Sequence, residues 1–203
     1  EENERLFRIY KDQGYSNQQI THLIGKNMDV AQILRRSADK WDGGYAMAGL
    51  IGHGDAFVLR DPSGIRPAYW YEDDEVVVVA SERPVIQTAF NVPMEEVVEL
   101  TPGHALIIRK DNRVSVEKVR EAKEIKACSF ERIYFSRGSD ADIYKERKEL
   151  GRLVVPRILD AVDHDLKNSV FSFIPNTAET AFLGMVKGLE DYLNQWKFDR
   201  LKE

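Results

Sequence analysis

The chain has 203 residues, of which 43% are hydrophobic and 31% are charged, and this balance is ordinary for a folded globular domain. Its net charge of −5 comes without a long basic run, so nucleic acid is not an expected partner. The single cysteine excludes an internal disulfide and fits a reducing, cytoplasmic compartment. No apolar stretch approaches the ~20 residues that a membrane-spanning helix needs, so no membrane partner is expected.

The beginning of the chain predicts three amphipathic helices. Apolar residues recur with helical spacing over 3–12, after Ser16 and again over 28–41. Ser16 is followed three residues later by Gln19, which is the spacing of a capping box. Because the sequence opens on Glu rather than Met and runs directly into a helical pattern, we expect it to be a fragment.

Residues 43–82 predict paired strands joined by short turns. The expected strands cover 45–51, 56–59, 68–71 and 75–80. The first two flank the glycine-rich reversal at 52–55, which is typical of a β-hairpin, and the turn at 60–67 contains Pro and Gly at turn positions. We expect these four strands to form one antiparallel meander.

Further strands should complete one compact domain near residue 120. A short helix is predicted over 83–90, with Pro84 tolerated in its first turn. Strand patterns follow at 96–100, 104–109 and 114–119. We therefore assign 1–120 to one domain and 121–140 to a linker.

Residues 141–203 predict the beginning of a second domain. A helical stripe over 141–162 is interrupted by Pro156, which should kink or break the helix. The apolar run 170–174 suits a buried strand, and 176–179 has the composition of a helix start. Helix, strand, turn and helix in this order make half of an α/β unit.

Several segments resemble one enzyme family. The motifs lie at 44–46 (GYA), 60–67 (RDPSGIRP), 79–82 (VASE) and 100–104 (LTPGH). In this order they resemble the glutaminase domain of the amidophosphoribosyltransferases, which are N-terminal-nucleophile glutamine amidotransferases. The segment 127–137 resembles the passage of that family into its phosphoribosyltransferase domain.

The resemblance implies an α+β fold, in which an incomplete αββα N-terminal-nucleophile sandwich with antiparallel sheets precedes the start of an α/β phosphoribosyltransferase-like domain. It implies that the intact protein uses glutamine-derived ammonia and 5-phosphoribosyl 1-pyrophosphate to make 5-phosphoribosylamine in de novo purine synthesis, as a cytoplasmic homo-oligomer. Mg²⁺ is the expected cofactor of the transferase half, with its site outside this chain. An iron–sulfur cluster is not expected, because it would need three cysteines besides Cys128.

Two positions are assigned to substrate by this resemblance. The nucleophile of the family is a terminal cysteine, so no catalytic residue or metal ligand is assigned here and we expect this chain alone to be inactive. Alignment on 22–24 (HLI) puts the glutamine-binding aspartate of the family at Ser16, with Asn17 beside it. Serine has no charge for an ammonium group, and a helix cap is its simpler role. Tyr144 is assigned to the contact between domains, or else is an ordinary tyrosine on a helix face.

Three questions stay open from the sequence. The intact protein could be a degenerate, non-catalytic paralogue with a regulatory or binding role, which the serine at position 16 favours. The sandwich could belong to another N-terminal-nucleophile hydrolase without a transferase partner, although the pattern of 128–196 argues against this. In the turn at 60–67, Arg60 could pair with Asp61 and Arg66 could bind an anion, or the turn could be purely structural.

Overall fold

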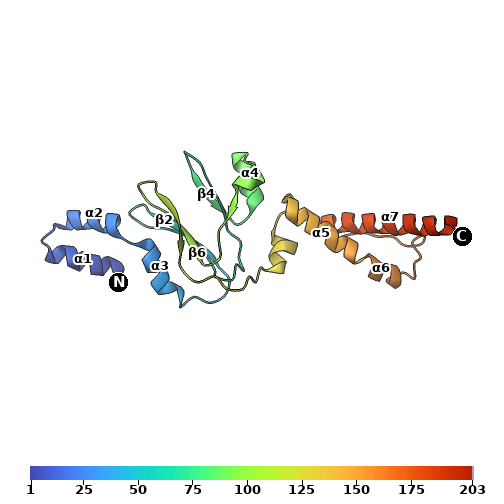
Figure 1. The fold of residues 1–203 in the computed structure, drawn as a ribbon, viewed down its shortest axis with the longest axis horizontal. Coiled ribbons are helices and arrows are strands. Elements are labelled where there is room, and N and C mark those ends of the chain that lie inside the picture. Colours follow the sequence, from blue (N-terminus) through green and yellow to red (C-terminus); the bar gives the residue numbers. More distant parts are fainter. Residues whose placement is uncertain (203) are drawn as a thin grey trace. The chain divides into compact units, whose positions relative to one another are not determined.

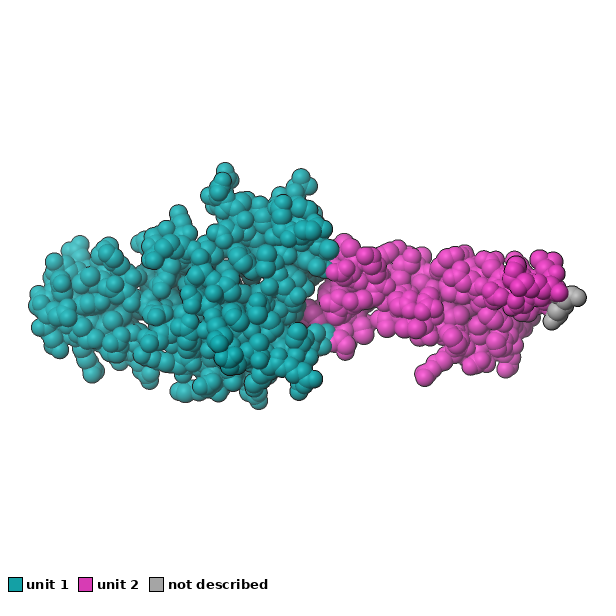
Figure 2. All heavy atoms as spheres, in the orientation of Figure 1, with its two compact units in different colours: residues 1–128 teal, residues 129–203 magenta. Residues whose placement is uncertain are grey.

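The computed structural model describes residues 1–202, and its contacts divide the chain after Cys128 into two compact units (Figures 1 and 2). This division falls within 121–140, the segment that the sequence suggests as a linker. No helix in the described part of the chain is long and apolar enough to cross a membrane.

The first unit begins with three helices, as the apolar spacing predicts. They span Glu2–Asp12 (α1), Asn17–Asn27 (α2) and Val30–Ala38 (α3). The predicted capping box begins α2, and the side chain of Asp29 accepts a hydrogen bond from the backbone N–H of Gln32 to begin α3. We call residues 2–27 the helical hairpin.

Two antiparallel sheets follow in the first unit. The strands span Ala46–Leu50 (β1), Ala56–Arg60 (β2), Tyr69–Glu72 (β3), Val77–Ala80 (β4), Val98–Glu99 (β5), His104–Ile108 (β6) and Val114–Lys118 (β7). A four-stranded sheet has the order β1-β2-β6-β7, and a three-stranded sheet has the order β4-β3-β5. The predicted strand segments are therefore present, and β5 is the most shortened of them.

The expected meander of four strands is wrong, because β2 and β3 lie in different sheets. β2 pairs with β1 and β6, whereas β3 pairs with β4 and β5. Between them, the side chains of Arg60 and Asp61 hydrogen-bond to carbonyl and N–H groups of the turn at 60–67. These bonds hold a turn that carries the chain from one sheet to the other, and apolar spacing alone does not reveal which strands pair.

The two sheets pack face to face between helices. Side chains alternate along β2 and β6, so that Leu59 and Ile107 pack with Leu34 of α3. Val58 and Leu106 point the other way and pack with residues of the three-stranded sheet. That sheet contacts α4 (Arg83–Phe90), which precedes a 3₁₀ turn at Met94–Glu96 (Figure 1). The expected incomplete αββα sandwich is confirmed.

The second unit consists of helices in the part that the structure describes. A π-helical turn, Glu131–Phe135, precedes α5 (Ala141–Leu153), α6 (Val155–Ala161) and α7 (Glu179–Lys202). The predicted break is confirmed: α5 ends before Pro156, which lies in the first turn of α6. Buried side chains of α6 and α7 form the core of this unit.

The expected strand at 170–174 is wrong. These residues have no regular structure, and Val170 and Ile174 are almost fully exposed. A strand needs a hydrogen-bonded neighbour, and no other strand lies in residues 129–202. The aromatic residues of the run pack on helices instead: Phe171 joins the core of α6 and α7, and the Phe173 ring lies 5.0 Å from that of Phe182.

Candidate functional site

Ser16, the first predicted site residue, is engaged in capping α2. Its hydroxyl oxygen accepts a hydrogen bond from the backbone N–H of Gln19 at 3.4 Å, and its own backbone N–H donates to Gln19 Oε1 at 2.9 Å. The Ser16 hydroxyl also donates to Gln19 Oε1 at 2.9 Å. These bonds satisfy the backbone N–H groups of Ser16 and Gln19, and they explain the serine without a ligand.

Asn17, the second predicted site residue, lies at the start of the same helix. Its side-chain oxygen accepts a hydrogen bond from Lys11 Nζ at 3.0 Å, which links α2 to the end of α1. An open cleft of about 430 Å³ lies on this part of the hairpin and is lined by Tyr15, Gln18, Gln19, His22 and Leu23. The lining offers amides, a phenol and an imidazole, but no carboxylate for an ammonium group.

The turn at 60–67 is built around the buried carboxylate of Asp61. Its oxygens accept hydrogen bonds from the backbone N–H groups of Ser63, Ile65 and Arg66, each at 3.0 Å. Asp61 is fully shielded from solvent, and such a carboxylate needs partners of this kind. Asp61 therefore shapes the turn.

Arg60 closes the same turn from the other side. Its guanidinium donates to the carbonyls of Leu100 at 2.6 Å, Arg66 at 2.8 Å and Gly64 at 3.3 Å, and it forms an ion pair with Glu99 at 2.8 Å. These contacts engage Arg60 with other groups of the chain rather than with Asp61. They support the purely structural role of the turn.

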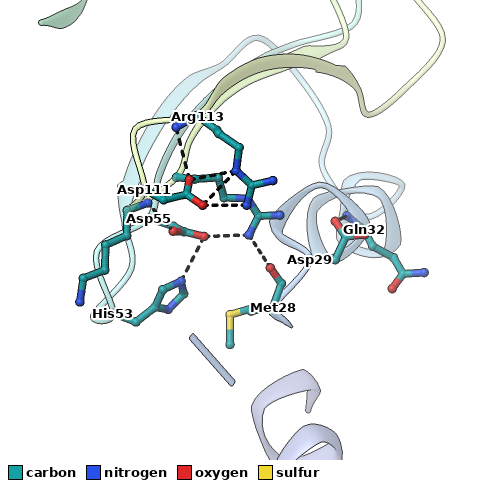
Figure 3. Close-up of polar contacts among 9 residues, drawn as sticks. Met28, Asp29, Gln32, His53, Asp55, Asp111 and Arg113 are labelled. Atoms are coloured by element: carbon teal, nitrogen blue, oxygen red, sulfur yellow. Dashed lines mark hydrogen bonds and ion pairs between the residues drawn. The ribbon is translucent and has the colours of Figure 1, made fainter. Parts of the chain in front are cut away.

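A second buried carboxylate, Asp55, lies at the tip of the first hairpin (Figure 3). Asp55 Oδ2 accepts a hydrogen bond from Arg109 Nη1 at 2.9 Å and lies 3.1 Å from His53 Nε2. Its other oxygen accepts from the backbone N–H of Lys110 at 2.9 Å. We call His53, Asp55 and Arg109 the clasp. Sequence reasoning missed it and assigned 52–55 only to a turn.

The charge of Asp55 is stabilised by these neighbours. Burial by itself would raise the pKa of Asp55, but the backbone N–H of Lys110 and the side chains of His53 and Arg109 outweigh this and hold the pKa below its usual value. The carboxylate therefore stays ionised inside the protein. The Arg109 guanidinium also donates to the carbonyl of Met28 at 2.6 Å.

The remaining candidates lie beyond the sheets. Tyr144 is on α5, partly exposed, with Lys148 Nζ 5.4 Å from its ring centre, and its role between domains stays a prediction. Cys128 is a free, half-buried thiol. Within residues 1–202, no group of three or more His, Cys, Asp or Glu side chains is placed to hold a metal ion.

A sequence profile of the class-II glutamine amidotransferases matches residues 14–135, which include both sheets and the start of α2. The chain belongs to this family. Among its relatives is the amidophosphoribosyltransferase of Pseudomonas aeruginosa, 29% identical over 161 residues that make up 74% of this chain and 31% of the relative. The enzyme of the same name from Schizosaccharomyces pombe is 25% identical over 92% of this chain and 38% of its own length.

Solved structures agree with this assignment of the fold. Glutamine phosphoribosylpyrophosphate amidotransferase from B. subtilis matches with a TM-score of 0.60 and 23% identity, over 92% of this chain and 41% of its own. A second structure, of the allosteric regulatory enzyme of purine biosynthesis, matches with a TM-score of 0.59. The chain thus spans about a third of the length of the curated relatives it matches.

Proposed function

We propose that the chain is part of an amidophosphoribosyltransferase that makes 5-phosphoribosylamine from glutamine-derived ammonia and 5-phosphoribosyl 1-pyrophosphate. The supporting observation is the share of the chain that the similarity to these enzymes covers. The class-II profile ends at residue 135, whereas the similarity to the Schizosaccharomyces pombe enzyme covers 92% of the chain. The second unit therefore favours a transferase over a class-II enzyme with a different partner domain.

In this proposal, the first unit belongs to the half that handles glutamine, and the second unit begins the half that handles the phosphoribosyl donor. Magnesium would neutralise the pyrophosphate leaving group in the intact enzyme. No residue of the described chain is assigned to it. We also expect the intact protein to be a cytoplasmic homo-oligomer, with Tyr144 at the contact between its domains.

A second candidate is a non-catalytic paralogue with a regulatory or binding role. The observation that favours it is the local structure at Ser16, where the capping box uses the hydroxyl and the neighbouring cleft has no carboxylate. Glutamine binding would then be weak, because its ammonium group lacks an opposite charge.

The two candidates differ in what the intact protein, expressed from the complete reading frame, should catalyse. With ammonia and 5-phosphoribosyl 1-pyrophosphate plus Mg²⁺, an amidophosphoribosyltransferase forms phosphoribosylamine. With glutamine in place of ammonia, we expect the same product at a lower rate. Absence of product from both nitrogen donors would overturn the proposal and leave the regulatory candidate.

The substitution Ser16→Asp tests the role of this position in glutamine binding. Aspartate caps a helix about as well as serine, and it adds a charge for the ammonium group. We expect the KM for glutamine to fall about tenfold or more, with the ammonia-dependent rate unchanged, in steady-state assays of the intact protein. Thr21→Asp adds the same charge one turn further along α2 and should leave the KM unchanged. An equal KM in wild type and Ser16→Asp would remove Ser16 from the substrate site.

A further inference from the structure

We propose that the helical hairpin is an arm that separates from the sheets as a unit, and that the clasp controls this separation. The hairpin carries the cleft at 15–23, so its movement would carry that cleft away from the sheets. The link to glutamine rests on the proposed function, but the movement itself does not.

The hairpin has an apolar core of its own. Leu6, Ile20 and Ile24 are buried together, and Tyr10 and Met28 pack against them. All five residues come from the hairpin or from the residue that ends α2. The apolar cores around β2 and β6 consist of other residues, which come mainly from α3 and the two sheets. Segments whose apolar contacts are internal are the ones that open as cooperative units.

Polar contacts fasten the end of α2 to the sheet. Arg109 Nη1 donates both to the carbonyl of Met28, the residue that ends α2, and to Asp55 Oδ2 (Figure 3). His53 packs closely on the same helix, because a Cβ added at Gly25 would lie 3.2 Å from His53 Cβ. The clasp therefore joins two strand connections, at 51–55 and 109–113, to one helix end.

The start of α1 has a second fastening, on α3. Glu2 Oε2 forms an ion pair with Arg36 Nη1 at 3.1 Å. Between the hairpin and α3, the backbone at Met28 and Asp29 is extended, so two non-helical residues connect them. An arm attached through this short connection and through charged contacts can detach without breaking an apolar core.

Separation would expose the hairpin to unfolding. Each of its helices has 11 residues, and isolated helices shorter than about 12–15 residues are marginal in water. Amide hydrogens of α1 and α2 should therefore exchange with solvent through the separated state. Amide hydrogens of β2 and β6, which are paired in the middle of their sheet, should need a larger opening.

The experiment is hydrogen–deuterium exchange of the full chain with the substitution Arg109→Gln. We expect exchange of 17–27 to become at least about tenfold faster, because the carbonyl of Met28 and the buried Asp55 each lose a partner. Exchange of β2 and β6 should change less. Arg113→Gln is the matched control: Arg113 pairs with exposed Asp111 near the clasp, so its removal should leave the hairpin unchanged.

Two results would overturn the proposal. One is equal acceleration of the hairpin and of β2 and β6, since that indicates global unfolding. The other is unchanged exchange of 17–27 in Arg109→Gln. If this variant does not fold, Arg36→Gln tests the second fastening and leaves the pair between Glu2 and Arg5 inside α1 in place. It should accelerate exchange of both hairpin helices about twofold or more, and the absence of that effect would equally exclude a separating arm.

Discussion

At the scale of single residues, two buried aspartates that look like ordinary turn residues organise the first unit. Asp61 collects three backbone N–H groups of one turn, and Asp55 holds the clasp. The capping role of Ser16 was predictable, because Gln19 follows at a fixed local spacing. The bond between Asp55 and Arg109 was not, because 54 residues separate them and only the pairing of β2 with β6 brings them together.

The Asp55 carboxylate should make stability dependent on pH. Because the pKa of Asp55 is lower in the folded chain, its contribution is fully present above its unfolded value near pH 4 and is lost as pH falls through the folded value. Asp55→Asn should therefore lower the free energy of unfolding by about 1–3 kcal/mol at pH 7, and this difference from wild type should shrink at pH 3. Urea unfolding at the two pH values measures it.

Asp111→Asn serves as the control for this pH effect. The Arg113 guanidinium also lowers the pKa of Asp111, but Asp111 is exposed on the adjoining turn. Its substitution should change stability little at either pH. A difference between wild type and Asp55→Asn that stays constant down to pH 3 would contradict the assigned charge of Asp55.

At the scale of elements, the boundaries of helices followed from the sequence better than the partners of strands. Spacing and caps predicted α1, α2 and α4 and the break before Pro156. The division of the strands between two sheets depends on the side chains inside the turn at 60–67. Whether 170–174 forms a strand depends on a neighbouring strand, and the sequence of this segment alone does not reveal one. The close packing of α5 against α7 was also missed. Gly151 of α5 lies against the backbone of Ala181 in α7, and Gly184 of α7 lies against the backbone of Lys148 in α5, so these contacts arise only in the fold.

The close packing of α5 against α7 predicts a steep cost for a single methyl group. A Cβ at Gly184 would overlap the backbone carbonyl of Lys148, which cannot move without shifting α5. Gly184→Ala should lower the free energy of unfolding of the second unit by about 2–3 kcal/mol, which thermal unfolding followed by circular dichroism can measure. Gly188→Ala should cost less, since its Cβ would meet a methyl group of Val155, and equal costs would refute the backbone overlap.

At the scale of the whole molecule, the chain spans about a third of the length of the curated relatives it matches. Its one thiol, Cys128, lies inside the sequence, whereas the resembled enzymes use a terminal cysteine whose own α-amino group is the base. A polypeptide of these 203 residues should therefore release no glutamate from glutamine, measured by a coupled glutamate assay. Glutamate release that disappears in Cys128→Ser would show that the internal thiol is reactive.

Arg60 connects the two sheets of the first unit. It ends β2 in one sheet, and its guanidinium binds the carbonyl of Leu100 and the carboxylate of Glu99, next to and within β5 of the other. The two sheets are consequently held together by one guanidinium group as well as by the apolar core between them. A mutation that replaces Arg60 would therefore disturb both sheets at the same time, and the structure of one sheet could not change at this position without affecting the other.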